Sequence, residues 1–157
     1  MANWSLDLNK FAKEADYKIK DVRRKFAFAL YAGIVKKTPV DTGSARANWN
    51  VSVGKVDPSV TDKTKKTGTR IKEADIKAEG DETIYISNNL PYITTLEYGG
   101  YPSPVKKGTY NKKTESYEIR SEGGYSKQAP SGMVGVTVAN SKKYFDAAVR
   151  SAKGGSK

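Results

Sequence analysis

The sequence contains no cysteine and no histidine. Without cysteine the chain has no disulfide bond, no thiolate metal ligand and no thiol nucleophile. Without histidine it has neither a Ser-His-Asp triad nor an imidazole metal site. A metal site built from carboxylates alone needs clustered acidic residues, and the sequence shows no such cluster. We therefore expect no metal and no cofactor.

Long apolar runs are also missing. No stretch approaches the roughly 20 apolar residues that a membrane-spanning helix needs. The first residues, Met1 to Ser5, lack the basic start and apolar stretch of a signal peptide. The expectation is synthesis in the cytoplasm and no membrane partner.

Negative charge is scarce relative to positive charge. The 157 residues include 28 Lys and Arg against 17 Asp and Glu, which gives a net charge of +11. Such a surface attracts polyanions, most commonly nucleic acid, although spread-out lysines also keep a chain soluble. Hydrophobic residues make up 37%, a low share for a self-sufficient core, so we expect loops or surfaces that a partner covers.

Apolar residues at steps of three and four predict a long amphipathic helix over residues 7–37, ended by Pro39. Gly33 within it indicates close approach by another element. The same kinds of signal predict a strand over 46–53, a strand over 83–87, a short helix over 91–98, a hairpin of 104–110 with 115–120, and a helix over 133–152. Alternating valines leave open an extended start for the last helix.

This order predicts one α+β domain over residues 1–157. The long N-terminal helix and the C-terminal helix are expected to pack on a small antiparallel sheet. Polar composition predicts flexible insertions near 57–82 and 101–125, and a disordered tail at 153–157.

The string Asp41-Thr42-Gly43 matches the signature of aspartic proteases, in which two facing aspartates share a proton. A homodimer could supply the second copy. The context differs, because residues 36–39 read Lys-Lys-Thr-Pro rather than an apolar strand. The alternative is a turn in which Asp41 caps amides and Gly43 takes an unusual backbone angle. We favour the turn, with Asp41, Thr42, Gly43 and Arg46 supporting the fold or a corner between subunits.

Two segments combine basic and aromatic residues. The loop with Lys63, Lys65, Lys66, Arg70 and Lys72 is a candidate DNA-facing surface, or else a solvated arm. Region 101–125 holds four of the ten tyrosines among lysines. Such rings stack on bases, but tyrosine is equally an interface residue, and protein contact is the favoured interpretation. A sequence-independent nucleic-acid-binding protein is the alternative function.

Three segments resemble the signatures of the phage tail-completion family, which includes proteins like lambda minor tail protein Z. Residues 38–49 read Thr-Pro-Val-Asp-Thr-Gly-Ser-Ala-Arg-Ala-Asn-Trp. Residues 86–92 read Ile-Ser-Asn-Asn-Leu-Pro-Tyr, and residues 96–99 read Leu-Glu-Tyr-Gly. Residues 126–133 read Ser-Lys-Gln-Ala-Pro-Ser-Gly-Met. The three occur in the order that the family has.

The resemblance implies a structural virion protein of the tail or neck, not an enzyme. It implies a homo-oligomeric ring, expected to be hexameric, between the tail tube or tail terminator protein and the head-tail connector or stopper protein. DNA is a candidate occupant of the ring's lumen. On this basis we expect an interface that includes Tyr98, Tyr101, Tyr125, Lys127, Gln128 and Met133.

Overall fold

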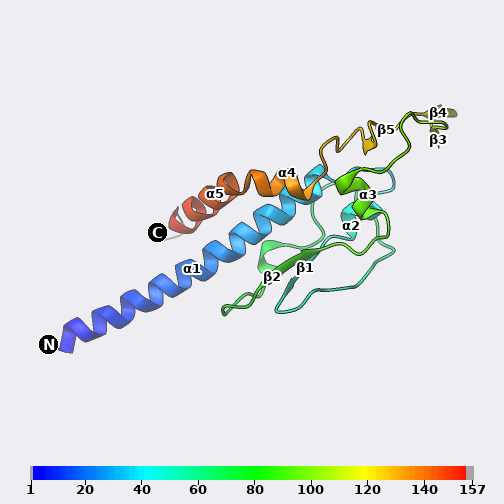
Figure 1. The fold of residues 1–157 in the computed structure, drawn as a ribbon. Helices are drawn as coiled ribbons and strands as arrows, with labels where there is room; N and C mark the ends of the chain where they lie inside the picture. Colours follow the sequence, from blue (N-terminus) through cyan, green and yellow to red (C-terminus); the bar gives the residue numbers. More distant parts are fainter. Residues whose placement is uncertain (1, 155–157) are drawn as a thin grey trace.

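The computed structural model describes the backbone of residues 2–154 and the side chains of Asp16 and residues 18–154. The fold is α+β, as predicted (Figure 1). Helix α1 (Ala2–Lys37) is the longest element, and its N-terminal part projects beyond the rest of the chain (Figure 1). The other helices are α2 (Ser44–Ala47), η1 (Glu73–Asp75), α3 (Ile93–Tyr98), α4 (Val134–Ala139) and α5 (Ser141–Gly154).

In the described residues, six short strands form three separate antiparallel pairs. β1 (Asn50–Val53) pairs with β2 (Ile84–Ser87), with Val51 opposite Ile86. The other pairs are β3 (Thr109–Asn111) with β4 (Ser116–Glu118), and β5 (Ser121–Glu122) with β6 (Tyr125–Ser126). The predicted hairpin is therefore confirmed in a shorter form, whereas β5–β6 was not predicted.

Helix α1 lies between the β1–β2 pair and α5 (Figure 1). On one side, Ala27 and Phe28 pack against the apolar side chains of the two strands. On the other, Phe26 meets Phe145 edge to face, with 5.5 Å between the ring centroids. A Cβ atom on Gly33 would lie 2.8 Å from the Tyr144 hydroxyl, which confirms the predicted close approach.

The main core forms where the C-terminal end of α1 meets the later segments. It contains Tyr31, Ile34, Val35, Ala45, Trp49, Leu96, Ala129 and Met133. The buried Trp49 donates from Nε1 to the hydroxyl of Thr38 at 2.9 Å, and that hydroxyl donates to the Ile34 carbonyl at 2.8 Å. The indole therefore buries its apolar surface with its single donor satisfied.

Several predicted elements were wrong in their boundaries: the long helix begins at Ala2 rather than at residue 7, and α3 begins at Ile93 rather than at residue 91. The strand predicted over 46–53 begins at Asn50, because a positive φ of 93° at Gly43 starts the short helix α2 first. The helix predicted over 133–152 is two helices that meet at Asn140, and its start is helical rather than extended. Helix α5 runs to Gly154, into the tail predicted to be disordered. The remainder of that tail, 155–157, lies outside the described residues.

Segment 57–82 has little regular structure, yet it is held against α1. Ile76 and Ala78 are buried beside Ala27, although the polar composition predicted a free arm. The Arg23 guanidinium donates to the carbonyls of Gly80 and Glu82. The overall polar composition of the segment did not reveal that these two apolar side chains, two residues apart, would be buried.

No helix in the described part of the chain is both long and apolar enough to cross a membrane.

Candidate functional site

The Asp-Thr-Gly segment forms a tight turn after α1. The Gly43 carbonyl accepts from the amides of Ala47 at 3.1 Å and Lys65 at 3.0 Å. A Cβ atom at this glycine would lie 2.8 Å from the backbone of Lys65, and its φ of 93° also disfavours other residues. The turn thus requires glycine, and it fastens the loop around Lys65 to the end of α1.

The Arg46 side chain forms hydrogen bonds with three backbone carbonyls. Its guanidinium donates to Thr38 at 2.9 Å, to Lys36 at 3.0 Å and to Lys66 at 2.7 Å. The Lys36 carbonyl lies in the last turn of α1 and the Thr38 carbonyl directly follows the helix, where helical partners run out. Burial lowers the pKa of Arg46 from its ordinary value. Arginine stays charged in proteins, so the contacts persist at neutral pH. A lysine could not reproduce this fork of donors.

The three sequence signatures come together in one hydrogen-bonded unit, which we call the corner: residues 38–46, 86–99 and 126–133. Asn88 donates from Nδ2 to the Ala45 carbonyl at 3.0 Å. Gln128 accepts from the Val40 amide at 2.8 Å and donates to the Val40 carbonyl at 3.0 Å, so its side chain pairs with that backbone as a neighbouring strand would. Segments far apart in sequence are therefore fixed relative to one another.

Glu97 makes the third link of the corner. Its carboxylate accepts from the amides of Met133 at 2.7 Å, Val134 at 2.8 Å and Gly135 at 2.8 Å, and so caps the start of α4. Burial raises the pKa of Glu97, but the three amide hydrogen bonds outweigh it, and the net pKa lies below the ordinary value. A Cβ atom on Gly132 would come within 2.4 Å of the Glu97 carbonyl oxygen, so glycine is needed there.

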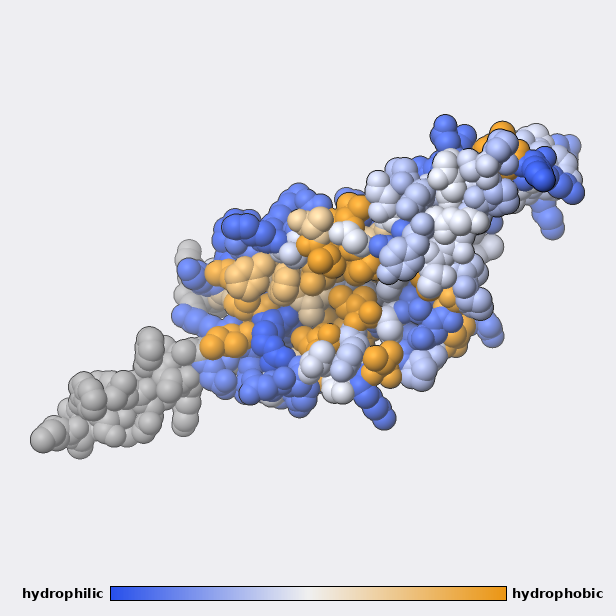
Figure 2. Space-filling model, viewed as in Figure 1, coloured by the Kyte–Doolittle hydropathy of each residue, from blue (hydrophilic) through white to orange (hydrophobic). Residues whose placement is uncertain are grey.

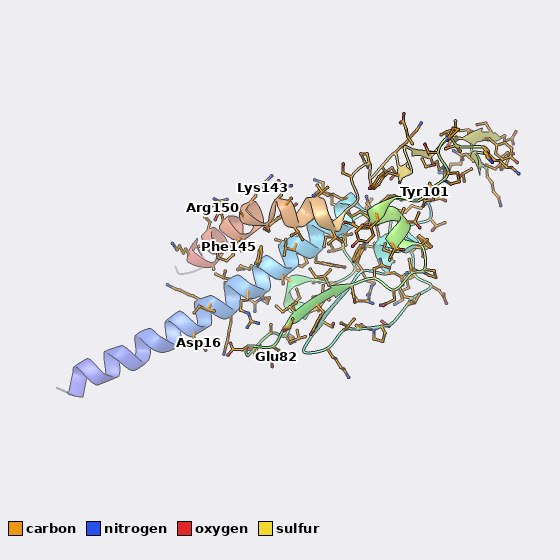
Figure 3. All side chains as sticks on the ribbon, viewed as in Figure 1. Asp16, Glu82, Tyr101, Lys143, Phe145 and Arg150 are labelled. Carbon is orange, nitrogen blue, oxygen red and sulfur yellow. The ribbon has the colours of Figure 1, made fainter. Side chains whose placement is uncertain are left out.

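A cleft of about 500 Å³ opens beside the turn. Val40, Leu96, Tyr101 and Val105 contribute apolar lining, whereas Lys106 and Lys107 add positive charge. Figure 3 shows Tyr101 next to α3. Burial raises the pKa of the Tyr101 hydroxyl, with a smaller contribution from Tyr92.

Asp41 forms an ion pair with Arg120 at 2.7 Å at the edge of this cleft. The hydrogen bond to Asp41 raises the pKa of Arg120. The Asp41 side chain is 69% exposed. A protease dyad instead needs an aspartate placed to share a proton with a second carboxylate. The turn interpretation is confirmed for the backbone angle of Gly43, but the Asp41 carboxylate pairs with Arg120 rather than capping amides.

Four of the six predicted interface residues lie within the corner, and Tyr101 and Tyr125 lie just outside its ranges. Tyr98 is 77% exposed, Lys127 and Gln128 are exposed, and Tyr101 and Tyr125 are partly buried. Met133 needs correction, because it is 0% exposed and packs in the core. Its apolar side chain fills the space under the start of α4 rather than lying on a surface.

The residues of the predicted basic loop have two different roles. Lys63, Lys65, Lys66 and Lys72 are exposed. Arg70 is exposed as well, but its guanidinium donates to the Ala47 carbonyl at 2.9 Å and to the Asn50 side chain at 2.5 Å, so it also stabilises the fold. Sequence reasoning also missed Asn88 and Glu97 as links of the corner. Their only signal was their place inside the second signature.

A comparison with protein families matches a family model described as "Bacteriophage HK97-gp10, putative tail-component" to residues 5–99. No curated protein and no solved structure gave a match. The matched residues cover more than half of the chain and include the first two signatures, which places the protein in the class of bacteriophage tail components. The chain belongs to the HK97 gp10-like family.

Proposed function

We propose that this protein completes the tail of a tailed bacteriophage by forming a ring in the neck, which joins the tail to the head-tail connector. Its role would then resemble that of lambda minor tail protein Z. The neighbours in this proposal are the tail tube or tail terminator protein on one side and the connector or stopper protein on the other. The single observation that carries the proposal is the corner, because the three segments that resemble tail-completion signatures are joined in it by hydrogen bonds.

Rigidity at the corner suits a ring subunit. A closed ring uses the same two surfaces on every copy, so their relative orientation must be fixed before assembly. Glu97, Gln128 and Asn88 supply that fixation with six hydrogen bonds of 2.7–3.0 Å across the three signatures. The aromatic Tyr98 stands exposed at the edge of this rigid unit, where a neighbouring copy can bury it.

The net charge of +11 also fits a subunit that stays soluble until it docks. Docking then covers apolar surface that the free chain leaves open. Figure 2 shows such apolar side chains gathered over the middle of the molecule. Phe145 on α5 is one apolar side chain that the free chain leaves 46% exposed.

The proposal is tested by deleting the gene from the phage and examining the particles by electron microscopy. We expect separate heads and tails, and joined particles when the wild-type chain is supplied from a plasmid. Tyr98→Ala should restore joining poorly, whereas Lys142→Ala, which removes a side chain that is 88% exposed on α5, should restore it fully. Normal infectious particles after the deletion would contradict the proposal.

A further inference from the structure

The β3–β4 hairpin projects from the body at the end opposite the free part of α1 (Figure 1). Its strands and flanks carry Lys106, Lys107, Lys112 and Lys113. Among the residues that the structure describes, none of these four lysines forms a salt bridge. This end of the molecule is mostly hydrophilic on the face that Figure 2 shows. The hairpin therefore presents, on a thin element, four ammonium groups that form no ion pair with a described carboxylate.

The hairpin carries two acidic residues, Glu115 at its exposed turn and Glu118 on β4, and Glu118 makes its contacts within the hairpin. Glu118 accepts from the Asn111 amide at 2.6 Å and the Thr114 hydroxyl at 3.1 Å, and it lies 3.6 Å from the Arg120 guanidinium. The Asn111 hydrogen bond is the main cause of the lowered pKa of Glu118. Glu118 is thus engaged by Asn111 and Arg120, and with Glu115 as the other carboxylate the four lysines still leave the hairpin net positive.

A tyrosine pair stiffens the other side of the hairpin. Tyr110 lies opposite Tyr117 in register, and the ring centroids are 5.3 Å apart at an interplanar angle of 62°. The rings are 49% and 60% exposed, and the Lys107 ammonium lies 5.6 Å from the Tyr117 centroid. A two-stranded hairpin is marginal alone, and such cross-strand aromatic contacts hold it in shape.

A second basic segment meets the same end of the molecule. The amide of Lys65 donates to Gly43 at 3.0 Å, and the cleft beside that turn is lined by Lys106 and Lys107. The predicted DNA-facing loop and the hairpin thus adjoin the same turn. Their charges add where a long polyanion can contact both.

We propose that the β3–β4 hairpin binds the phosphate backbone of double-stranded DNA without sequence preference. A two-stranded ribbon fits the major groove, and lysines that neutralise phosphates release counterions. The location of this contact rests on the proposed function, since the lumen of a neck ring is where the genome passes. The binding itself is a property of the chain and can be measured on purified protein.

The test measures binding of a short random-sequence DNA duplex to the full-length protein by fluorescence anisotropy over a series of salt concentrations. The hairpin variant changes Lys106, Lys107, Lys112 and Lys113 together to Ala. Each lost phosphate contact lowers the slope of log affinity against log salt by about 0.9, so the hairpin variant should lose about 3 to 4 units of slope. Replacing the same four lysines by Arg should keep the slope.

A matched control removes the same number of positive charges from α5, by changing Lys142, Lys143, Arg150 and Lys153 to Ala. Figure 3 shows Lys143 and Arg150 far from the hairpin. This control variant should keep most of the wild-type slope of log affinity against log salt. Equal losses in both variants, or no salt-dependent binding by the wild type, would overturn the inference.

Phage assembly separates this inference from the proposed function. If the hairpin variant binds DNA like the wild type but fails to join heads to tails, the hairpin is a protein contact and the inference is wrong. If the hairpin variant shows the reduced slope of log affinity against log salt and still joins heads to tails, both the inference and the proposed function are supported. If deletion of the gene leaves particles normal, the proposed function fails, whereas the slope measured on purified protein still decides the DNA contact.

Discussion

Replacing Glu97 should weaken the fold more than replacing any exposed carboxylate. Its carboxylate accepts three backbone amides at 2.7–2.8 Å. A hydrogen bond to a charged group contributes about 1.5 to 3 kcal/mol, but solvent replaces part of this at a partly exposed site. Glu97→Ala should therefore lower the free energy of unfolding by about 2 to 4 kcal/mol. In a chain of this length, about 3 kcal/mol corresponds to a fall in Tm of about 6 to 12 °C.

The assay is urea unfolding followed by circular dichroism, with Glu79→Gln as the control, because Glu79 is exposed. Glu97→Gln keeps one acceptor oxygen and should lose about half as much as Glu97→Ala. If Glu97→Ala unfolds at the same urea concentration as the control and the wild type, the capping argument is wrong.

The pH dependence of the same residue follows from its lowered pKa. A carboxyl group whose pKa is lower in the folded state stabilises the fold above its ordinary pKa of 4.5, and this contribution is lost as the pH falls through the folded-state pKa. The stability difference between wild type and Glu97→Gln should therefore be constant near neutral pH and shrink on acidification. A difference that grows below pH 4.5 would contradict the assignment.

Three further substitutions test the corner and the core, each by the urea midpoint. Arg46→Lys should lose about 1 to 3 kcal/mol because lysine cannot reach three carbonyls, whereas the exposed Arg150→Lys should be neutral. Gly132→Ala should cost about 2 to 4 kcal/mol, because its φ is +75° and a Cβ would clash with backbone. Trp49→Phe should cost about 1 to 3 kcal/mol through the lost indole hydrogen bond, and an unchanged midpoint would refute that contact's role.

Local patterns predicted the elements that have strong periodicity. The long helix was found because its apolar stripe runs through many turns, and Gly33 marked its contact with α5. Helix α2 was missed because four residues are too few to show a period, and its buried alanines alternate with polar residues as a strand would. The break at Asn140 was missed because the residues on both sides of it are helical, so the pattern reads as one continuous helix.

The site was predicted only as a set of separate segments. The signatures indicated which residues belong together, but the contacts that join them span long distances in sequence. Glu97 caps a helix that starts 37 residues later, at Val134, and rules for capping consider only neighbouring residues. Met133 was expected on a surface because the pattern cannot tell which side of a segment the core will cover.

The central claim, that this chain forms a ring in the neck, is tested most directly by electron cryomicroscopy of the head–tail junction in particles of the phage that encodes it. The account predicts a closed ring of identical copies between the tail and the connector, with the corner at the contacts between copies and the β3–β4 hairpin facing the DNA channel. A junction reconstructed at side-chain detail that contains no copy of this chain, or only an isolated one, would contradict the account.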